Sequence, residues 1–300
     1  MASYTKHQAG TFCWTELCSR DWASAKAFYT QLFDWQHDDQ PIGDDLYYTM
    51  LQLNGKDIGA MYQMEAERLE QKVPSHWLNY IAVDNVDETV EKAKQAGARV
   101  IAGPHDVMDA GRMAMFFEPN GAMFAIWQGN QHCGSQIKNE ARSVCWNELA
   151  SKDAEASRQF YSSVFGWQYK VEDMDGMPYT IFTLGDEEVA GMLEMNEEWG
   201  DMPAHWMTYF QVTNCDETLA KVEELGGTVC VPATDVPNVG RFSVINDPQG
   251  GFLSVIEIHI LIQICETKKF CEQKIFLLTK FFCGTKKFCD KKFFSHKIFL

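Results

Sequence analysis

The sequence lacks long apolar runs, closely spaced cysteine pairs and a recognisable secretory signal. Its nearest approach to a membrane span, residues 258–264 (IHILIQI), is far shorter than the ~18 apolar residues that a span needs. None of the ten cysteines has CxxC spacing, which argues against a structural zinc site. The first ten residues are polar. We therefore expect a cytoplasmic protein with reduced thiols and no membrane span.

Three common functional motifs are also absent. There is no GxGxxG, no P-loop and no GxSxG, so nucleotide-binding and serine hydrolase functions have no support. The 300 residues contain 26 Lys and Arg against 42 Asp and Glu, a formal net charge of -16, which argues against nucleic acid as a partner. The charge is uneven, because residues 259–300 contain nine lysines and only three acidic residues.

The remainder of the chain contains one unit twice. Residues 13–36 (CWTELCSRDWASAKAFYTQLFDWQ) match residues 145–168 (CWNELASKDAEASRQFYSSVFGWQ). Residues 74–127 align with residues 203–256 without a gap, and 18 of these 54 positions are identical. A repeat of about 130 residues is too long for a solenoid and indicates a duplicated domain.

A further match lies between these blocks, where YTMLQL (48–53) corresponds to YTIFTL (179–184). Together the matches and the polar linker between them predict the domain organisation. We predict a first domain over 1–128, a linker over 129–141, a second domain over 142–258 and a Lys/Phe/Cys-rich tail over 259–300.

Each copy shows the same order of secondary structure twice. An alternating aromatic pattern predicts a strand over residues 12–17, and Asp21 can cap the helix that follows it. Three short strands come next. The order then restarts with a strand over residues 77–83 and a helix that Asn85 can cap. Each copy therefore reads as two βαβββ units, an α+β fold.

Paired βαβββ units with this spacing resemble the glyoxalase, bleomycin resistance protein and extradiol dioxygenase superfamily, also called vicinal oxygen chelate proteins. Asp21-x6-Phe28-Tyr29 recurs in the second copy, and VDNVDETVEKAKQAGARV (83–100) corresponds to VTNCDETLAKVEELGGTV (212–229). The resemblance covers residues 1–258. It implies two tandem domains that pair with each other, each with two modules curved around a cleft that binds a small molecule.

The resemblance also implies a divalent metal held by His and Glu residues on the first and last strands, and here the sequence departs from the family. The corresponding positions in the two copies are occupied by Trp14, Leu78, Ala125, Trp146, Met207 and Ser254. Indole and aliphatic side chains do not coordinate such metals. We therefore expect neither a bound metal nor another cofactor.

In each copy, two ionisable residues lie two positions away from the places where the family has metal ligands. They are our candidate catalytic residues: Glu16, His76, Glu148 and His205. A step of two along a strand keeps a side chain on the same face, so all four are expected to face the cleft. Antiparallel strands would keep each Glu close to its His, and parallel strands would separate them. A carboxylate that orients an imidazole could form an acid–base pair. A partial metal site and a purely structural role are the alternatives.

Aromatic residues and arginines that recur in both copies are our candidates for substrate binding: Trp14, Tyr80, Arg112, Trp146, Tyr209 and Arg241. Rings can stack on a ligand, and a guanidinium suits a carboxylate or a phosphate. Packing of the rings in the cleft wall and internal ion pairs of the arginines are the alternatives.

The tail contains a local repeat, ETKKFCEQK (266–274) and GTKKFCDKK (284–292). We predict a disordered appendage, with an anionic membrane surface or an acidic partner as the alternative target.

Three functions fit the sequence. The first is a metal-independent enzyme that acts on a small molecule through the Glu and His residues. The second is a non-catalytic protein that sequesters aromatic or cationic compounds, as bleomycin resistance proteins do. The third is a metalloenzyme with shifted ligands.

Overall fold

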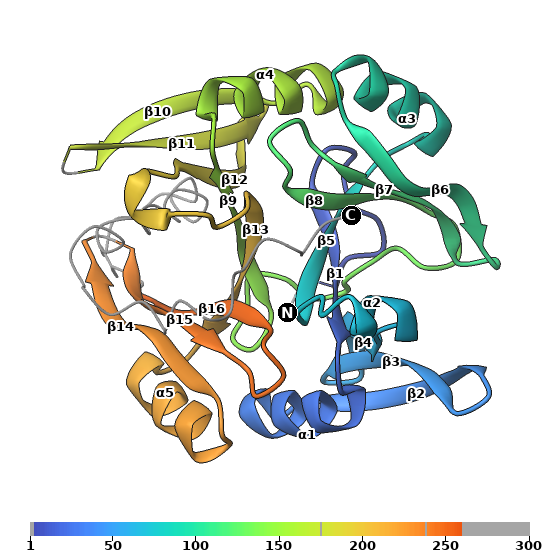
Figure 1. The fold of residues 1–300 in the computed structure, drawn as a ribbon, viewed down its shortest axis with the longest axis vertical. Coiled ribbons are helices and arrows are strands. Elements are labelled where there is room, and N and C mark those ends of the chain that lie inside the picture. The colour runs from blue at the N-terminus through green and yellow to red at the C-terminus, as the bar shows by residue number, and fades with distance from the viewer. Residues whose placement is uncertain (1–2, 175, 238, 260–300) are drawn as a thin grey trace.

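The computed structural model describes residues 3–174, 176–237 and 239–259, which form two similar halves (Figure 1). The first half contains β1 (Phe12–Ser19), α1 (Trp22–Phe33), β2 (Gln36–Gly43), β3 (Leu46–Leu53), β4 (Lys56–Gln63), α2 (Ala66–Glu70), β5 (His76–Ala82), α3 (Val86–Gln95), β6 (Arg99–Val107), β7 (Gly111–Phe117) and β8 (Met123–Gly129). The second half contains β9 (Val144–Ser151), α4 (Ala154–Phe165), β10 (Gln168–Met174), β11 (Met177–Leu184), β12 (Glu187–Glu194), η1 (Glu197–Trp199), β13 (His205–Val212), α5 (Cys215–Glu224), β14 (Thr228–Val236), β15 (Gly240–Asn246) and β16 (Phe252–Ile258).

The four longer helices begin where the sequence predicts. In each one, a side-chain oxygen of the capping residue accepts a hydrogen bond from the backbone N–H three residues later; the caps are Asp21, Asn85, Asp153 and Asn214. The short helices α2 and η1 were not predicted. With five and three residues, they are too short to show a helical apolar period.

Each half contains one eight-stranded sheet, and the strand orders are β2-β3-β4-β1-β5-β8-β7-β6 and β10-β11-β12-β9-β13-β16-β15-β14. The paired βαβββ units are confirmed. At the centre of each sheet the first strands of the two units run antiparallel, β1 with β5 and β9 with β13. This settles the strand direction that the sequence left open.

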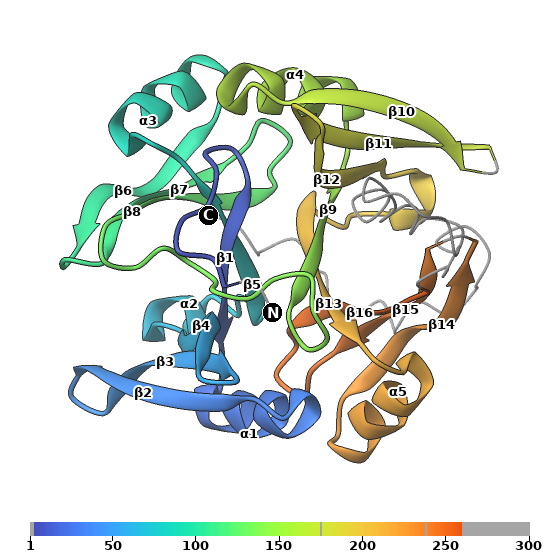
Figure 2. The ribbon, with the colours of Figure 1, turned by 180° about the vertical axis from the view of Figure 1, so that it is seen from behind.

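Each sheet curves, with its central strands near the middle of the molecule and its edge strands at opposite ends (Figures 1 and 2). The helices α1 and α3 lie on the outer side of the first sheet. We call the opposite side, which carries no long helix, concave face 1. The corresponding side of the second sheet is concave face 2.

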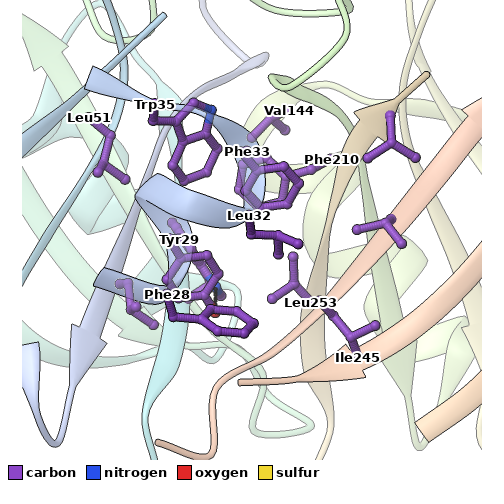
Figure 3. Packing of buried hydrophobic residues seen from close by; sticks show 14 of the residues in the cluster. Phe28, Tyr29, Leu32, Phe33, Trp35, Leu51, Val144, Phe210, Ile245 and Leu253 are labelled. Atoms are coloured by element: carbon purple, nitrogen blue, oxygen red, sulfur yellow. Dashed lines mark hydrogen bonds between the residues drawn. The ribbon is translucent and has the colours of Figure 1, made fainter. Parts of the chain in front are cut away.

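The outer face of each sheet is buried against the other half. One core cluster combines Phe28, Tyr29 and Phe33 of α1 with residues of the second half such as Phe210 and Leu253, as Figure 3 shows. A second cluster combines residues of β5, α3 and β8 with residues of α4 and β12. Each unit of one half therefore shares its core with a unit of the other half.

Hydrogen bonds also join the two halves. The Tyr29 hydroxyl donates to Asp247 at 2.7 Å, and the Trp167 indole donates to the Gly10 carbonyl at 2.7 Å. The Thr208 hydroxyl donates to the Asn79 side chain at 3.0 Å. Asn79 and Thr208 occupy the same position in the two copies, so their contact lies on the axis that relates the halves.

No described helix is long and apolar enough to cross a membrane. The described cysteines are all free thiols, which agrees with the absence of a disulfide pattern. The predicted disordered tail lies almost wholly outside the described residues.

Replacement of Phe210 tests whether the shared core stabilises the fold. Its ring is buried and lies 5.2 Å from Trp77 and 5.3 Å from Phe33, both in the other half. We expect Phe210→Ala to lower the free energy of unfolding by about 3–5 kcal/mol in urea denaturation, because it leaves a cavity. The exposed Val171→Ala is the control, expected within about 0.5 kcal/mol of wild type. Equal effects of the two substitutions would contradict the expectation.

Candidate active site

The register of the central strands places Glu16 in the middle of concave face 1. Glu16 lies opposite Ala60 on β4 and opposite Leu78 on β5, and Trp14 lies opposite Tyr80. Residues directly opposite each other in a sheet project to the same side. Trp14, Glu16 and Tyr80 therefore share the concave face, as the sequence predicts.

Glu16 is almost completely buried, and tyrosine hydroxyls hold its carboxylate. Tyr80 donates a hydrogen bond to Oε1 at 2.7 Å, and Tyr48 of β3 donates to Oε2 at 2.8 Å. The Trp14 indole N–H donates to the Tyr48 hydroxyl at 3.1 Å. These four residues form what we call the Glu16 cluster.

The second half repeats this arrangement on concave face 2. Tyr209 donates to Oε1 of Glu148 at 2.8 Å, Tyr179 of β11 donates to Oε2 at 2.7 Å, and Trp146 donates to the Tyr179 hydroxyl at 3.2 Å. We call these residues the Glu148 cluster. Gly191 lies opposite Glu148 and makes room for the Tyr179 hydroxyl, since a Cβ there would lie 1.8 Å from that oxygen.

Burial favours the protonated form of both glutamates. It raises the pKa of Glu16, against the hydrogen bonds from Tyr80 and Tyr48, which favour the charged form. In the second half, burial raises the pKa of Glu148 from 4.5 to about 7, and hydrogen bonds from Tyr179 and Tyr209 oppose the shift. A carboxyl group with such a pKa can both hold and release a proton near neutral pH.

The predicted hydrogen-bonded Glu–His pair is not formed. Nδ1 of His76 pairs with the Pro74 carbonyl at 2.9 Å, and Nδ1 of His205 pairs with the Pro203 carbonyl at 2.9 Å. Among the described residues no hydrogen bond joins either histidine to the glutamate beside it. The reason is that nearby carbonyl groups already engage Nδ1, while the carboxylates are occupied by tyrosines.

Neither histidine has the raised pKa that a neighbouring carboxylate would cause. Desolvation lowers the pKa of His76 to about 4, and it lowers the pKa of His205. Both imidazoles are therefore neutral at neutral pH. With a proton on Nδ1 for the carbonyl, each presents Nε2 as an acceptor.

The two arginines form the ion pairs that we considered as their alternative use. Arg112 contacts Asp87 at 2.9 Å and Asp106 at 2.8 Å, and Arg241 contacts Asp216 at 2.9 Å and Asp235 at 3.1 Å. These hydrogen bonds lower the pKa of Asp87 and of Asp216. Most guanidinium donors are thus occupied.

The donor set does not fit the divalent metal that the resemblance implies. In residues 3–174, 176–237 and 239–259, no group of three or more His, Cys, Asp or Glu side chains lies close enough to hold a metal ion. Each concave face offers one central carboxylate, surrounded by phenol, indole and aliphatic groups.

Sequence reasoning missed two members of the clusters, Tyr48 and Tyr179. The signal was available, because both begin the matching segments YTMLQL and YTIFTL. It also missed His132 of the linker, whose ring lies edge-on to Trp14 with centroids 4.7 Å apart. No repeat or periodicity marks that contact.

Two eight-stranded sheets built from paired βαβββ units, each with a buried central glutamate, define a tandem glyoxalase-like protein. Residues 11–126 and 143–255 each match the Glyoxalase/Bleomycin resistance protein/Dioxygenase superfamily. The chain belongs to this superfamily.

Related proteins match nearly the whole of both halves. "Putative glyoxylase CFP32" of Mycobacterium tuberculosis (strain CDC 1551 / Oshkosh) is 38% identical over 259 residues, covering 86% of this chain and 98% of the relative. "Anthracycline biosynthesis protein DnrV" of Streptomyces peucetius is 32% identical over 267 residues, covering 85% of this chain and 95% of the relative.

Solved structures share the fold at low sequence identity. The Mn(II)-bound glyoxalase from Novosphingobium aromaticivorans has a TM-score of 0.57 and 15% identity, covering 83% of this chain and 82% of that chain. A variant of homoprotocatechuate 2,3-dioxygenase from B. fuscum has a TM-score of 0.60 and 13% identity, covering 84% of this chain and 72% of that chain.

The raised pKa of Glu148 makes stability depend on pH. Between pH 4.5 and about 7, Glu148 keeps its proton in the folded state and releases it in the unfolded state. The protonated group therefore stabilises the fold below pH 4.5, and this stabilisation is lost as the pH rises to about 7. Glu148→Gln removes the titration. We compare the free energy of unfolding of the variant with that of wild type at each pH. The difference, variant minus wild type, should be about 3 kcal/mol more positive at about pH 8 than at about pH 4.

Urea denaturation at both pH values measures this difference. Glu197→Gln, at an exposed position of η1, is the matched control and should show no pH-dependent difference from wild type. A pH-independent effect of Glu148→Gln would show that the buried carboxyl has an ordinary pKa.

Proposed function

We propose that this protein binds a small organic molecule on its concave faces and transfers a proton on it through Glu16 and Glu148, without the metal site usual in its superfamily. One observation carries the proposal. Both halves keep a buried glutamate with a raised pKa under the same two tyrosine hydroxyls and one indole N–H.

The chemistry follows from the balance of two opposing effects. Burial stabilises the neutral carboxylic acid, and the tyrosine hydroxyls stabilise the carboxylate. For Glu148, with a pKa of about 7, neither form is strongly disfavoured near neutral pH. Such a group can take a proton from a carbon acid and return it to a neighbouring atom. Each carboxylate oxygen has a second lone pair, so a ligand can still approach it.

The other candidate residues take supporting roles in this proposal. Tyr80 and Tyr209 hold the carboxylates in place. Neutral His205 presents an Nε2 acceptor at one end of concave face 2, whereas Nε2 of His76 pairs with Arg68 at 3.3 Å. Arg112 and Arg241 are left out, because aspartates already occupy their guanidinium groups.

The surface of concave face 1 suggests an aromatic ligand. Several of its half-buried side chains are aromatic rings and thioethers, which adapt to flat apolar molecules: Tyr48, Met50, Tyr62, Met115 and Met123. The name of the Streptomyces relative refers to anthracycline biosynthesis. We therefore propose aromatic carbonyl compounds as the substrate class. We also propose that the two halves act as one paired unit.

Substitution of both glutamates tests the proton transfer. Aromatic ketones and quinones that raise the melting temperature would be incubated with the protein in D2O, and exchange of the hydrogen next to the carbonyl would be followed by NMR. We expect the double variant Glu16→Gln, Glu148→Gln to bind these compounds but to exchange the hydrogen at least about 100-fold more slowly. Glu197→Gln should behave as wild type. Undiminished exchange in the double variant would refute the proposal.

Metal removal provides a separate test. After dialysis against EDTA we expect the exchange rate and the melting temperature to be unchanged, because no ligand set for a metal lies beside either glutamate among the described residues. Elemental analysis of protein purified without added metal should find no stoichiometric transition metal. Loss of exchange that Mn2+ or Zn2+ restores would instead support a metalloenzyme with shifted ligands.

Sequestration without chemistry is the second candidate function. The observation in its favour is that Tyr48 and Tyr80 already occupy both oxygens of Glu16, and Tyr179 and Tyr209 both oxygens of Glu148. Tight binding of the same compounds with no detectable exchange in the wild-type protein would favour it.

A further inference from the structure

The two concave faces differ at the end that carries the histidine. In the first half Tyr62 and His76 flank Cys18 across adjacent strands. In the second half Leu193 corresponds to Tyr62, Ala150 to Cys18 and His205 to His76. The glutamate clusters are thus alike, whereas the histidine end of concave face 1 is the more polar one, because Tyr62 and Cys18 are replaced by Leu193 and Ala150 in concave face 2.

A cation lies at the polar end. Arg68 of α2 places its guanidinium 3.3 Å from Nε2 of His76 and 3.9 Å from Sγ of Cys18. It also lies close enough to favour ionisation of Tyr62, although burial dominates and raises the pKa of that hydroxyl. The side chains of Arg68, Tyr62 and His76 are all half-buried, so solvent reaches this end.

Arg68 has no carboxylate partner in the part of the chain that the structure describes. Two other arginines are engaged without a carboxylate: Arg20 donates to the Val73 carbonyl, and Arg99 lies over the Phe117 ring. Other arginines find acidic partners at about 3 Å: Arg112, Arg142, Arg158 and Arg241. The contact with His76 does not neutralise Arg68, because the imidazole is uncharged and its Nε2 only accepts the hydrogen bond.

The contact instead fixes the direction of the guanidinium. His76 is held by the Pro74 carbonyl on Nδ1 and accepts from Arg68 on Nε2. Five N–H groups belong to a guanidinium, and the contacts with His76 and Cys18 use two of them. The remaining donors form a planar fork of the kind that binds a carboxylate.

We propose that Arg68 binds the carboxylate of an aromatic acid at the His76 end of concave face 1. The inference rests on the proposed function, since it assumes that this face binds small molecules. Concave face 2 lacks the subsite: Leu193 replaces Tyr62, and the ring of Trp199 lies 6.2 Å from His205. The two faces therefore select different ligands, an anionic one for the first half and an uncharged one for the second.

Calorimetric titration with a matched pair of probes tests the subsite. The probes are 2-naphthoate and its uncharged analogue 2-naphthamide. Wild-type protein should bind one equivalent of 2-naphthoate at least about tenfold more tightly than 2-naphthamide, as expected for a charge-assisted hydrogen bond. Arg68→Gln should abolish this preference and leave the affinity for 2-naphthamide within about twofold, and Arg68→Lys should restore part of the preference.

Lys72→Gln is the matched control, because it removes one positive charge from an exposed side chain close to α2. It should keep the preference for 2-naphthoate. The thermal melting curve of each variant shows whether it is folded.

Three results would overturn the subsite: equal affinities of the two probes for the wild type, an unchanged preference in Arg68→Gln, or no binding of either probe. None of them decides the proton transfer, which hydrogen exchange in the glutamate variants measures separately. If the glutamate variants lose hydrogen exchange and Arg68→Gln keeps the preference for 2-naphthoate over 2-naphthamide, the proposed function holds and this subsite does not exist.

Discussion

The structure depends on one constraint: neither half can bury the outer face of its sheet alone. The rings of α1 pack against strands of the second half, and α4 packs against strands of the first. Burial of this apolar surface is the main favourable contribution to folding. Because the outer faces are used in this way, the concave faces are left to hold the glutamate clusters. The placement of both candidate sites follows from how the halves cover each other.

The sequence predicts the fold well, because the fold depends on local patterns that occur four times. Caps such as Asp21 and Asn85, the apolar period of the helices and the alignment of residues 74–127 with 203–256 all point to paired βαβββ units. The short helix α2 was missed for a physical reason. It has one and a half turns and no buried side chain of its own, so it leaves no periodic signal. Arg68, which α2 positions, was missed with it.

The candidate site was predicted only in part. Alternation along β1 and β5 correctly places Trp14, Glu16 and Tyr80 on one face, since side-chain direction in a strand is a local property. The partner of Glu16 is not local. Tyr48 reaches the carboxylate from β3, two strands away across the sheet, and a tyrosine hydroxyl completes hydrogen bonds that the sequence assigned to His76. Which polar groups meet in a buried cluster depends on the reach of side chains across several strands, and strand periodicity does not encode that.

The contact between Asn79 and Thr208 shows what joining the two copies in one chain makes available. In a symmetric pair of identical subunits, the residue on the axis meets itself, and every substitution appears twice. Here two different side chains meet on the axis and complement each other as donor and acceptor. The same freedom extends to the concave faces, where half-buried Tyr62 in one copy is replaced by leucine in the other. A gene that encodes both copies can thus alter the chemistry of one surface while the other keeps its original form.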